Sequence, residues 1–121
     1  MNNLITICFS SQAQADADAV HSFIAPLGMT LVGVSVYPEA FSGTPTGFNL
    51  DINIGETEAV KALSAGTAGT AAAWKTPHFG GSNAPIALAA GDAVTVDINL
   101  SGGATPTADY DIVLWLLAGT V

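Results

Sequence analysis

Two segments of the chain alternate apolar and polar residues with period two, and this pattern constrains the fold more than any other feature. Residues 48–54 read FNLDINI and residues 94–100 read VTVDINL, with the same Asp-Ile-Asn step in the same phase. Successive side chains of a β-strand point to opposite faces of its sheet. Each segment therefore predicts a strand with one apolar face and one polar face.

Further strands are predicted where β-branched and other apolar residues gather between turns. These segments are residues 3–9, 29–37 and 110–117, and short strands could also form at 71–75 and 84–88. Residues 39–47 contain two glycines and a proline, so they are predicted to form a loop.

Two segments leave the choice between helix and strand open. Residues 12–24 could begin a helix, but the stretch from Ala19 to Ile24 could equally be a strand. Residues 57–63 place Glu58 and Lys61 at a helical i,i+3 spacing, although they directly follow a predicted strand.

These segments together predict a single-domain, all-β protein with little helix. A chain of 121 residues has the size of one domain. About eight short antiparallel strands between Gly-, Pro- and Thr-rich turns suit a jelly-roll-like β-sandwich. Within residues 1–121, we expect residues 1–28 to form an N-terminal strand or arm and residues 29–121 to form the core of the sandwich.

The charge of the chain restricts its partners. Ten Asp and Glu residues stand against Lys61 and Lys75, no arginine is present, and the formal net charge is −8. Nucleic-acid binding depends on Lys and Arg contacts to phosphates, and anionic membrane surfaces repel an acidic chain. We therefore expect neither nucleic acid nor a membrane as a partner.

Nothing in the sequence predicts catalysis or a cofactor. Cys8 is the only cysteine, and no pattern brings His21 or His78 to it as a base. Its apolar surroundings predict a buried, unreactive side chain. No two acids are set apart as glycoside hydrolysis requires. We expect a protein that is not an enzyme and needs no cofactor.

The repeated Asp-Ile-Asn step raises one metal hypothesis. Oxygen ligands on Asp51, Asn53, Asp97 and Asn99 could hold Ca²⁺ if the two strands are neighbours. A polar row is also what the solvent-facing side of any half-buried strand shows. We adopt this second interpretation and expect no metal.

The last predicted strand is apolar on both faces. Its outward row begins with Asp109 and Asp111 and continues with Val113, Trp115 and Leu117, so the row turns from polar to apolar partway along. A strand that is apolar on both sides is expected to be covered on both sides. A neighbouring subunit or a long loop of the same chain would provide the cover.

Half of the residues are hydrophobic, and apolar residues beyond those that fill the core usually mark contact surfaces. The cluster around residues 74–79 could belong to the core with His78 in an exposed turn, anchor a protein interface, or stack on a sugar. We expect self-association or docking on a larger assembly. The candidate interface residues are Leu4, Ile5, Trp74, His78, Phe79, Val113, Trp115 and Leu117.

Three segments resemble a recurring module of tailed-bacteriophage structural proteins. They are residues 45–53 (PTGFNLDIN), 90–99 (AGDAVTVDIN) and 106–112 (PTADYDI). In that module a P-x-G turn leads into a strand, a G-D-x-V-T-V-D strand follows, and a P-x-A-D turn leads into the closing strand. The resemblance spans residues 30–118, and residues 56–70, rich in Ala, Gly and Thr, depart from the module's central hairpin.

The resemblance implies a jelly-roll capsid decoration (cement) protein of a virion. Such a protein is expected to form a homotrimer, to bind the major capsid protein on the capsid exterior and to stabilise the assembled shell. The alternative is a carbohydrate- or receptor-binding module of a phage tail or head-fibre appendage. Neither implies catalytic residues.

Overall fold

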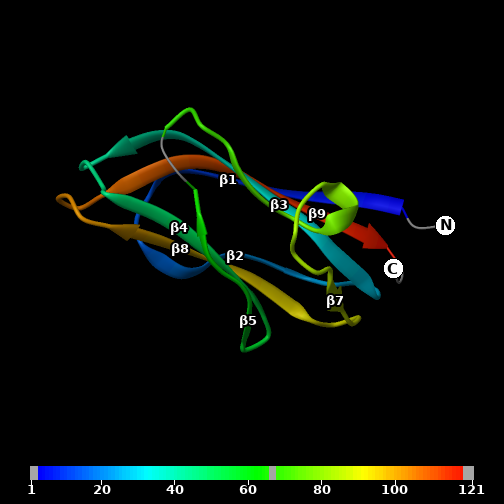
Figure 1. Cartoon of the computed structure of the whole chain (residues 1–121). Coiled ribbons are helices and arrows are strands. Elements are labelled where there is room, and N and C mark those ends of the chain that lie inside the picture. The colour runs from blue at the N-terminus through cyan, green and yellow to red at the C-terminus, as the bar shows by residue number, and fades with distance from the viewer. Residues whose placement is uncertain (1–2, 66–67, 119–121) are drawn as a thin grey trace.

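The structure is a computed structural model that describes residues 3–65 and 68–118. Figure 1 shows two β-sheets packed face to face, with one short 3₁₀ turn beside them. One sheet has five strands and the other has four, and all paired strands are antiparallel. The predicted all-β sandwich is confirmed, with nine strands in the described residues rather than about eight.

The first sheet has the spatial order β1 (Asn3–Gln14), β9 (Thr107–Ala118), β3 (Met29–Ser42) and β6 (Ala72–Lys75), and β7 (Ile86–Leu88) also pairs with β3. The second sheet has the order β2 (Ala17–Ile24), β8 (Ala93–Ser101), β4 (Gly47–Ile54) and β5 (Thr57–Ser64). The 3₁₀ turn η1 (Pro77–Phe79) lies between β6 and β7. From β1 to β4 the chain changes sheet at every step.

The predicted alternation builds the core between the two sheets. Alternate residues of β4, β8 and β9 are buried as far as Ile52, Leu100 and Leu116, and the residues between them are only partly covered. Burying such side chains is the main favourable contribution to folding. Fully buried residues from these strands are Leu50, Ile52, Val96, Ile98, Ile112, Leu114 and Leu116.

The segments that the sequence left open are strands. Residues 17–24 form β2, which pairs with β8, and residues 57–64 form β5, which pairs with β4. Residues 3–24 thus supply one strand to each sheet. The described residues contain no helix that is long and apolar enough to cross a membrane.

The prediction of a loop over residues 39–47 was wrong for its first part, because β3 continues to Ser42. Ala40, Phe41 and Ser42 pair with the beginning of β9. Pro38 has no N–H to donate, and an irregularity in the β3–β9 register between Pro38 and Ala40 accommodates it.

Three edge strands, β1, β2 and β5, each carry a bulge built in the same way. At each bulge an alanine has a positive φ, and its backbone N–H donates to an aspartate carboxylate on the neighbouring inner strand. Bulges twist an edge strand and interrupt its exposed hydrogen-bonding groups. The pairs are Ala13 with Asp109 at 2.7 Å, Ala19 with Asp97 at 2.8 Å and Ala62 with Asp51 at 2.6 Å.

Candidate assembly surface

The outer face of the β1–β9–β3 sheet is divided into an apolar half and an acidic half. Leu4 of β1 lies opposite Leu117 of β9, and Cys8 lies opposite Val113, all on the side away from the core. Leu4 is 48% exposed. We name this surface the apolar face and define it by Leu4, Thr6, Cys8, Gly33, Val113, Trp115 and Leu117.

Trp115 is held at the centre of the apolar face. Its indole Nε1 donates to the Ser35 hydroxyl at 3.0 Å. Gly33 is the register partner of Trp115 on β3, and a Cβ at Gly33 would lie 3.4 Å from the indole Cδ1. The missing side chain leaves room beside the indole. A Cβ at this position would already be in van der Waals contact with the ring, so a large side chain would crowd it.

A hollow of about 200 Å³ lies over Gly33. Its aromatic lining comes from Trp74 of β6, Phe79 of η1 and Trp115 of β9, and Lys75 of β6 contributes its one charged residue. Phe79 is 39% exposed. The lining residues are Gly33, Val34, Ser35, Trp74, Lys75, Phe79 and Trp115.

The structure brings together only part of the candidate interface. Leu4, Val113, Trp115 and Leu117 lie on the apolar face, and Phe79 lies at the adjoining hollow. Trp74 also lines the hollow, but it is partly buried against the core, as is Ile5. His78 lies in η1, and its side chain is outside the described part of the structure.

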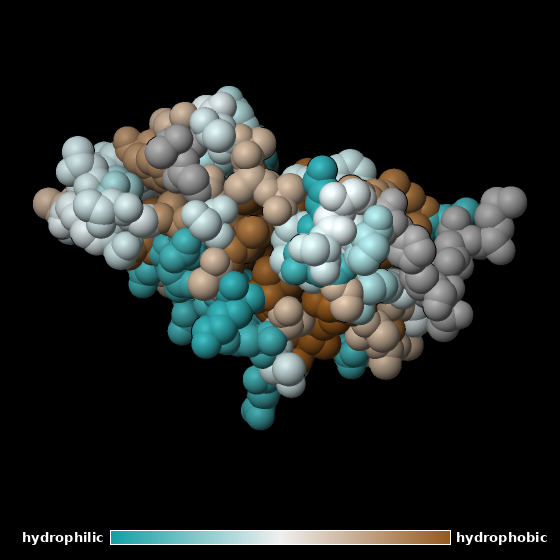
Figure 2. Space-filling model, viewed as in Figure 1, coloured by the Kyte–Doolittle hydropathy of each residue, from teal (hydrophilic) through white to brown (hydrophobic). Residues whose placement is uncertain are grey.

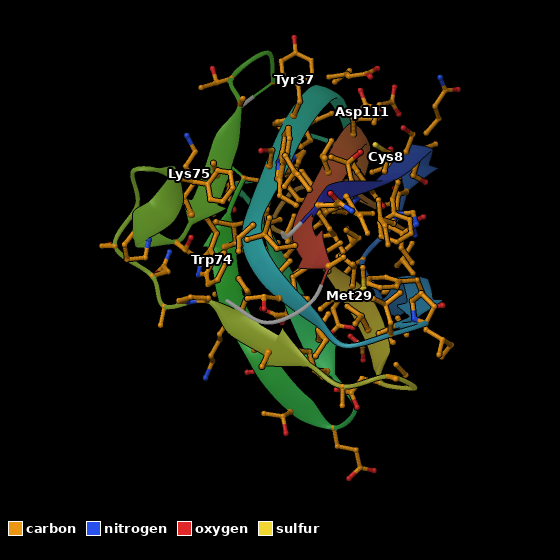
Figure 3. The ribbon with its side chains drawn as sticks, turned by 90° about the vertical axis from the view of Figure 1, so that its right-hand side faces the viewer. Cys8, Met29, Tyr37, Trp74, Lys75 and Asp111 are labelled. Carbon is orange, nitrogen blue, oxygen red and sulfur yellow. The ribbon has the colours of Figure 1, made fainter. Side chains whose placement is uncertain are left out.

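The other half of this sheet face is acidic. Ser10 donates to Asp111 at 2.5 Å, and Glu39 shares a hydrogen bond with the same carboxylate. That hydrogen bond, followed by the Asp111 charge, raises the pKa of Glu39. The hydrogen bonds from Ser10 and then Glu39 lower the pKa of Asp111. Figure 3 shows Asp111 between Tyr37 and Cys8 on three adjacent strands.

The prediction that Cys8 is buried was wrong. Ile7 and Phe9 take the inward positions of β1, so strand alternation turns Cys8 outward, where it is exposed. Phe9 stacks on His21 on the inner side, with ring centroids 4.8 Å apart. The Cys8 thiol and the His21 imidazole therefore lie on opposite sides of β1, where they cannot act as a nucleophile and its base.

The polar row proposed for calcium lies on paired strands, since β4 and β8 are neighbours. Asn99 Nδ2 donates to Asp51 at 3.0 Å, and Asn53 Nδ2 donates to Asp97 at 2.9 Å. The remaining oxygen of each aspartate accepts the N–H of a bulge alanine. The carboxylate oxygens are thus occupied by N–H donors. In the described ranges, no group of three or more His, Cys, Asp or Glu residues is arranged to hold a metal.

A cluster that the sequence did not suggest lies at the seam between β1 and β2. His21 Nε2 and the Tyr110 hydroxyl are 2.7 Å apart. Burial lowers the pKa of His21. Burial raises the pKa of Tyr110 to about 12, while a hydrogen bond with Ser11 acts in the opposite direction. The two residues are 89 positions apart in strands of different sheets, so no sequence spacing reveals their contact.

No protein-family model matches the chain, and no curated protein matches it either. The class that the structure defines is an all-β protein with two antiparallel sheets packed as a sandwich.

Proposed function

We propose that this protein is a structural component of a virion, a capsid decoration protein that binds the outside of the assembled shell and stabilises it. The observation that carries the proposal is the apolar face, a surface without charged residues on a chain of net charge −8. The resemblance of residues 30–118 to the module of tailed-bacteriophage structural proteins suggests which assembly the protein binds, namely a phage capsid.

Two further observations support a binding role over catalysis. Strand β1 separates the exposed Cys8 thiol from the His21 imidazole. The polar side chains on the outer faces of β4 and β8 hydrogen-bond to one another. Exposed hydrophobic patches on small proteins mark contacts with other macromolecules. The major capsid protein and further copies of this chain are the partners that the proposal names, with the trimer as the stoichiometry that the resemblance implies.

The stabilising mechanism follows from mass action. A protein that binds the assembled shell and not its free subunits shifts the equilibrium toward the shell. Many copies on one shell make weak individual contacts act together. Apolar contact suits this role, because an acidic protein of this kind has few cations to offer for ion pairs.

The test is an electron cryo-microscopy reconstruction of the particles with which the protein co-purifies. The proposal predicts density for the sandwich at repeated local three-fold or quasi-three-fold positions of the capsid. Density at the tail tip alone, or a protein that never accompanies particles, would overturn it. A Leu4→Asp variant is expected to lose occupancy, whereas Ile24→Asp, at an exposed isoleucine on β2 of the other sheet, is expected to keep it.

The hollow over Gly33 favours a second candidate, a carbohydrate- or receptor-binding module of a virion appendage. Aromatic rings beside a lysine and a serine hydroxyl can stack on a sugar and donate hydrogen bonds to it. A glycan array probed with the labelled full chain tests this candidate. Binding that is lost in Phe79→Ala and kept in Leu27→Ala would favour the appendage module over the decoration protein.

A further inference from the structure

The free edge of β1 is the longest regular strand edge in the described structure. β1 lies at the margin of its sheet, and β9 is the one strand that pairs with it among residues 3–65 and 68–118 (Figure 3). The nine residues 3–11 pair with β9 without a shift in register, and the bulge at Ala13 comes after them. Alternate residues of this stretch turn their N–H and C=O groups away from β9, where they can pair with another strand.

The other edges are shorter, irregular or charged. β2 pairs with β8 in uninterrupted register only from His21 to Ile24, and the register between β4 and β5 shifts twice. β5 also carries Glu58 and Lys61, and Figure 2 shows hydrophilic side chains gathered over it. β6 and β7 have four and three residues. Short, bulged and charged edges resist pairing with another chain, so β1 is the edge best suited to accept a strand.

The sequence of β1 lacks the residues that usually protect an edge. Residues 3–11 read NLITICFSS and contain no charged residue, no proline and no glycine. Lysine and proline are the residues with which edge strands commonly prevent pairing. The β-branched and aromatic residues of this stretch favour the extended conformation that pairing requires.

The inward row of β1 is incompletely covered. Ile5, Ile7 and Phe9 pack against the core but are only partly buried, whereas their register partners on β9 are fully buried. The difference arises because β1 has a strand on one side only. A strand added beyond β1 would cover the inward row, provided that it brings apolar side chains at alternate positions.

We propose that the occupant of this edge is β1 of a second copy, paired antiparallel about a two-fold axis that passes through Ile7. The strand that fits the edge is extended, uncharged and apolar at alternate positions, and β1 itself has all three properties. An antiparallel pair of identical strands is self-complementary, so each copy satisfies the open edge of the other. The two five-stranded sheets become one continuous sheet.

The inward row selects this register. With Ile7 on the axis, Ile7 faces Ile7 of the second copy and Ile5 faces Phe9, so each apolar residue of the row meets an apolar partner. Moving the axis by one residue in either direction places one of the three against a polar residue, Asn3 or Ser11. Cross-strand pairs of aromatic and β-branched side chains are among those that stabilise a sheet.

The same axis keeps the carboxylates of the two copies apart. Asp111 is the register partner of Ser10, which lies three residues along β1 from Ile7. The rotation carries Asp111 of the second copy to the other side of the axis, level with Leu4. Like charges placed against each other at an interface are unfavourable, so this separation suits a chain of net charge −8.

The pairing leaves the apolar face free. Leu4, Thr6 and Cys8 keep their outward positions, and the apolar faces of the two copies lie side by side on one surface. The proposed function gives this surface to the capsid shell, and edge pairing does not compete with the shell for it. The inference does not rest on the proposed function, and it yields a pair of chains where the resemblance implies three.

The first test is sedimentation velocity of the purified full chain over a range of concentrations, in the absence of particles. We expect a dimer. Thr6→Asp adds a charge to the exposed side of the β1 edge, and Thr57→Asp adds the same charge to the edge strand β5. Thr6→Asp is expected to raise the dissociation constant more than tenfold, and Thr57→Asp less than twofold. A monomer at all concentrations, or an assembly that Thr6→Asp leaves intact, would overturn the inference.

The second test measures the register by disulfide formation. With Ile7 on the axis, Thr6 lies directly opposite Cys8 of the second copy. Directly opposite residues have Cα atoms about 4.5–5.5 Å apart, which a disulfide can bridge. The two Cys8 residues of the wild-type pair are about 8 Å apart, which is too far. A cysteine at position 10 lies about 14 Å from Cys8 of the second copy.

The cysteine variants are therefore expected to differ sharply. After copper-catalysed air oxidation, Thr6→Cys should give a covalent dimer on a non-reducing gel, and Ser10→Cys and the wild type should give little. Equal yields, or a solution dimer in which Thr6→Cys does not cross-link, contradict the proposed pairing. Circular dichroism checks that each variant folds. If the chain is monomeric but still decorates particles, the inference fails while the proposed function stands, and a dimer that never accompanies particles has the reverse meaning.

Discussion

The Asp97 carboxylate joins three strands by accepting the backbone N–H of Ala19 at 2.8 Å and the side-chain amide of Asn53 at 2.9 Å. Ala19 belongs to the edge strand β2 and has a φ of 50°. L-residues adopt this left-handed conformation at a cost of roughly 1–2 kcal/mol. The hydrogen bond to Asp97 helps to hold the bulge in place, and it suggests how the same device works at Ala13 and Ala62.

Replacement of Asp97 by alanine removes both acceptors at once. We expect the free energy of unfolding to fall by about 1–3 kcal/mol, because the Ala19 N–H and the Asn53 amide lose their partners. Urea denaturation monitored by tryptophan fluorescence measures the change. Asp18→Ala, at an exposed acid on the same edge strand, serves as the control and should change stability by less than about 0.5 kcal/mol. Equal losses in the two variants would contradict this role for Asp97.

Replacement of Ala19 by glycine should stabilise the protein. Glycine adopts positive φ without the penalty that alanine incurs, although it loses more backbone entropy on folding. The expected net gain is about 0.5–1 kcal/mol in the free energy of unfolding. Ala17→Gly, in the same strand without a positive φ, should destabilise instead. Thermal denaturation of both variants checks the opposite signs.

The contact between Gly33 and Trp115 predicts a strict size limit at position 33. A Cβ at Gly33 would already contact the indole, so the two methyl groups of Gly33→Val are expected to crowd it. Overpacking of this kind typically costs about 1–3 kcal/mol, and a loss of about that size is expected. The matched variant is Gly28→Val. At Gly28 a Cβ would meet only the Leu88 carbonyl oxygen, at 3.9 Å, so this change should be better tolerated. Equilibrium unfolding of both proteins decides the point.

Protonation of His21 should weaken the fold in mild acid. Burial lowers the folded-state pKa of His21 below its ordinary value of 6.5, so the unfolded chain binds the proton more readily. The corresponding stability is present above pH 6.5 and is lost as the pH falls through the folded-state pKa. Unfolding measured from pH 7.5 to pH 5 should show this slope in the wild type and a reduced slope in His21→Gln.

The Glu39 and Asp111 carboxyls should titrate on opposite sides of their ordinary values. The raised pKa of Glu39 gives stability that is present below pH 4.5 and is lost as the pH rises through the folded-state pKa. The lowered pKa of Asp111 gives stability that is present above pH 3.8 and is lost as the pH falls through its own folded-state pKa. The two contributions coexist between pH 3.8 and 4.5.

Carboxyl-detected NMR titration tests this pair directly. In Asp111→Asn, the pKa of Glu39 should move back toward 4.5, because the charge and most of the hydrogen bonding that raise it are gone. An unchanged Glu39 titration would show that the two side chains do not interact.

The central strands were predictable because their two environments differ. In β4 and β8, one row of side chains faces the core and the other faces solvent. The sequence of these strands therefore alternates apolar and polar residues, such as Leu50 and Asp51. The edge strands β2 and β5 were left open for the converse reason. Their bulges at Ala19 and Ala62 insert a residue and break the alternation on which the prediction depends.

The candidate site was most predictable where it follows a single strand. Val113, Trp115 and Leu117 stand in one outward row, and the change of that row from polar to apolar was the strongest signal for a contact surface. Gly33 gave no signal, since its role depends on Trp115, which is distant in the chain. Cys8 was misplaced because its neighbours Ile7 and Phe9 are apolar. Only the pairing of β1 with β9 shows that it lies on the outer face.

Half of the protein's acidic residues are partnered by the main chain rather than by cations. Five of the ten accept a backbone N–H, and with two lysines and no arginine the chain could not have paired them with positive side chains. These residues are Asp16, Asp51, Asp92, Asp97 and Asp109. Net charge and strand geometry are therefore coupled in this protein. An engineer who wished to make it less acidic could do so at Asp18, Glu56 or Glu58, whereas neutralising the five would loosen the strands that they hold.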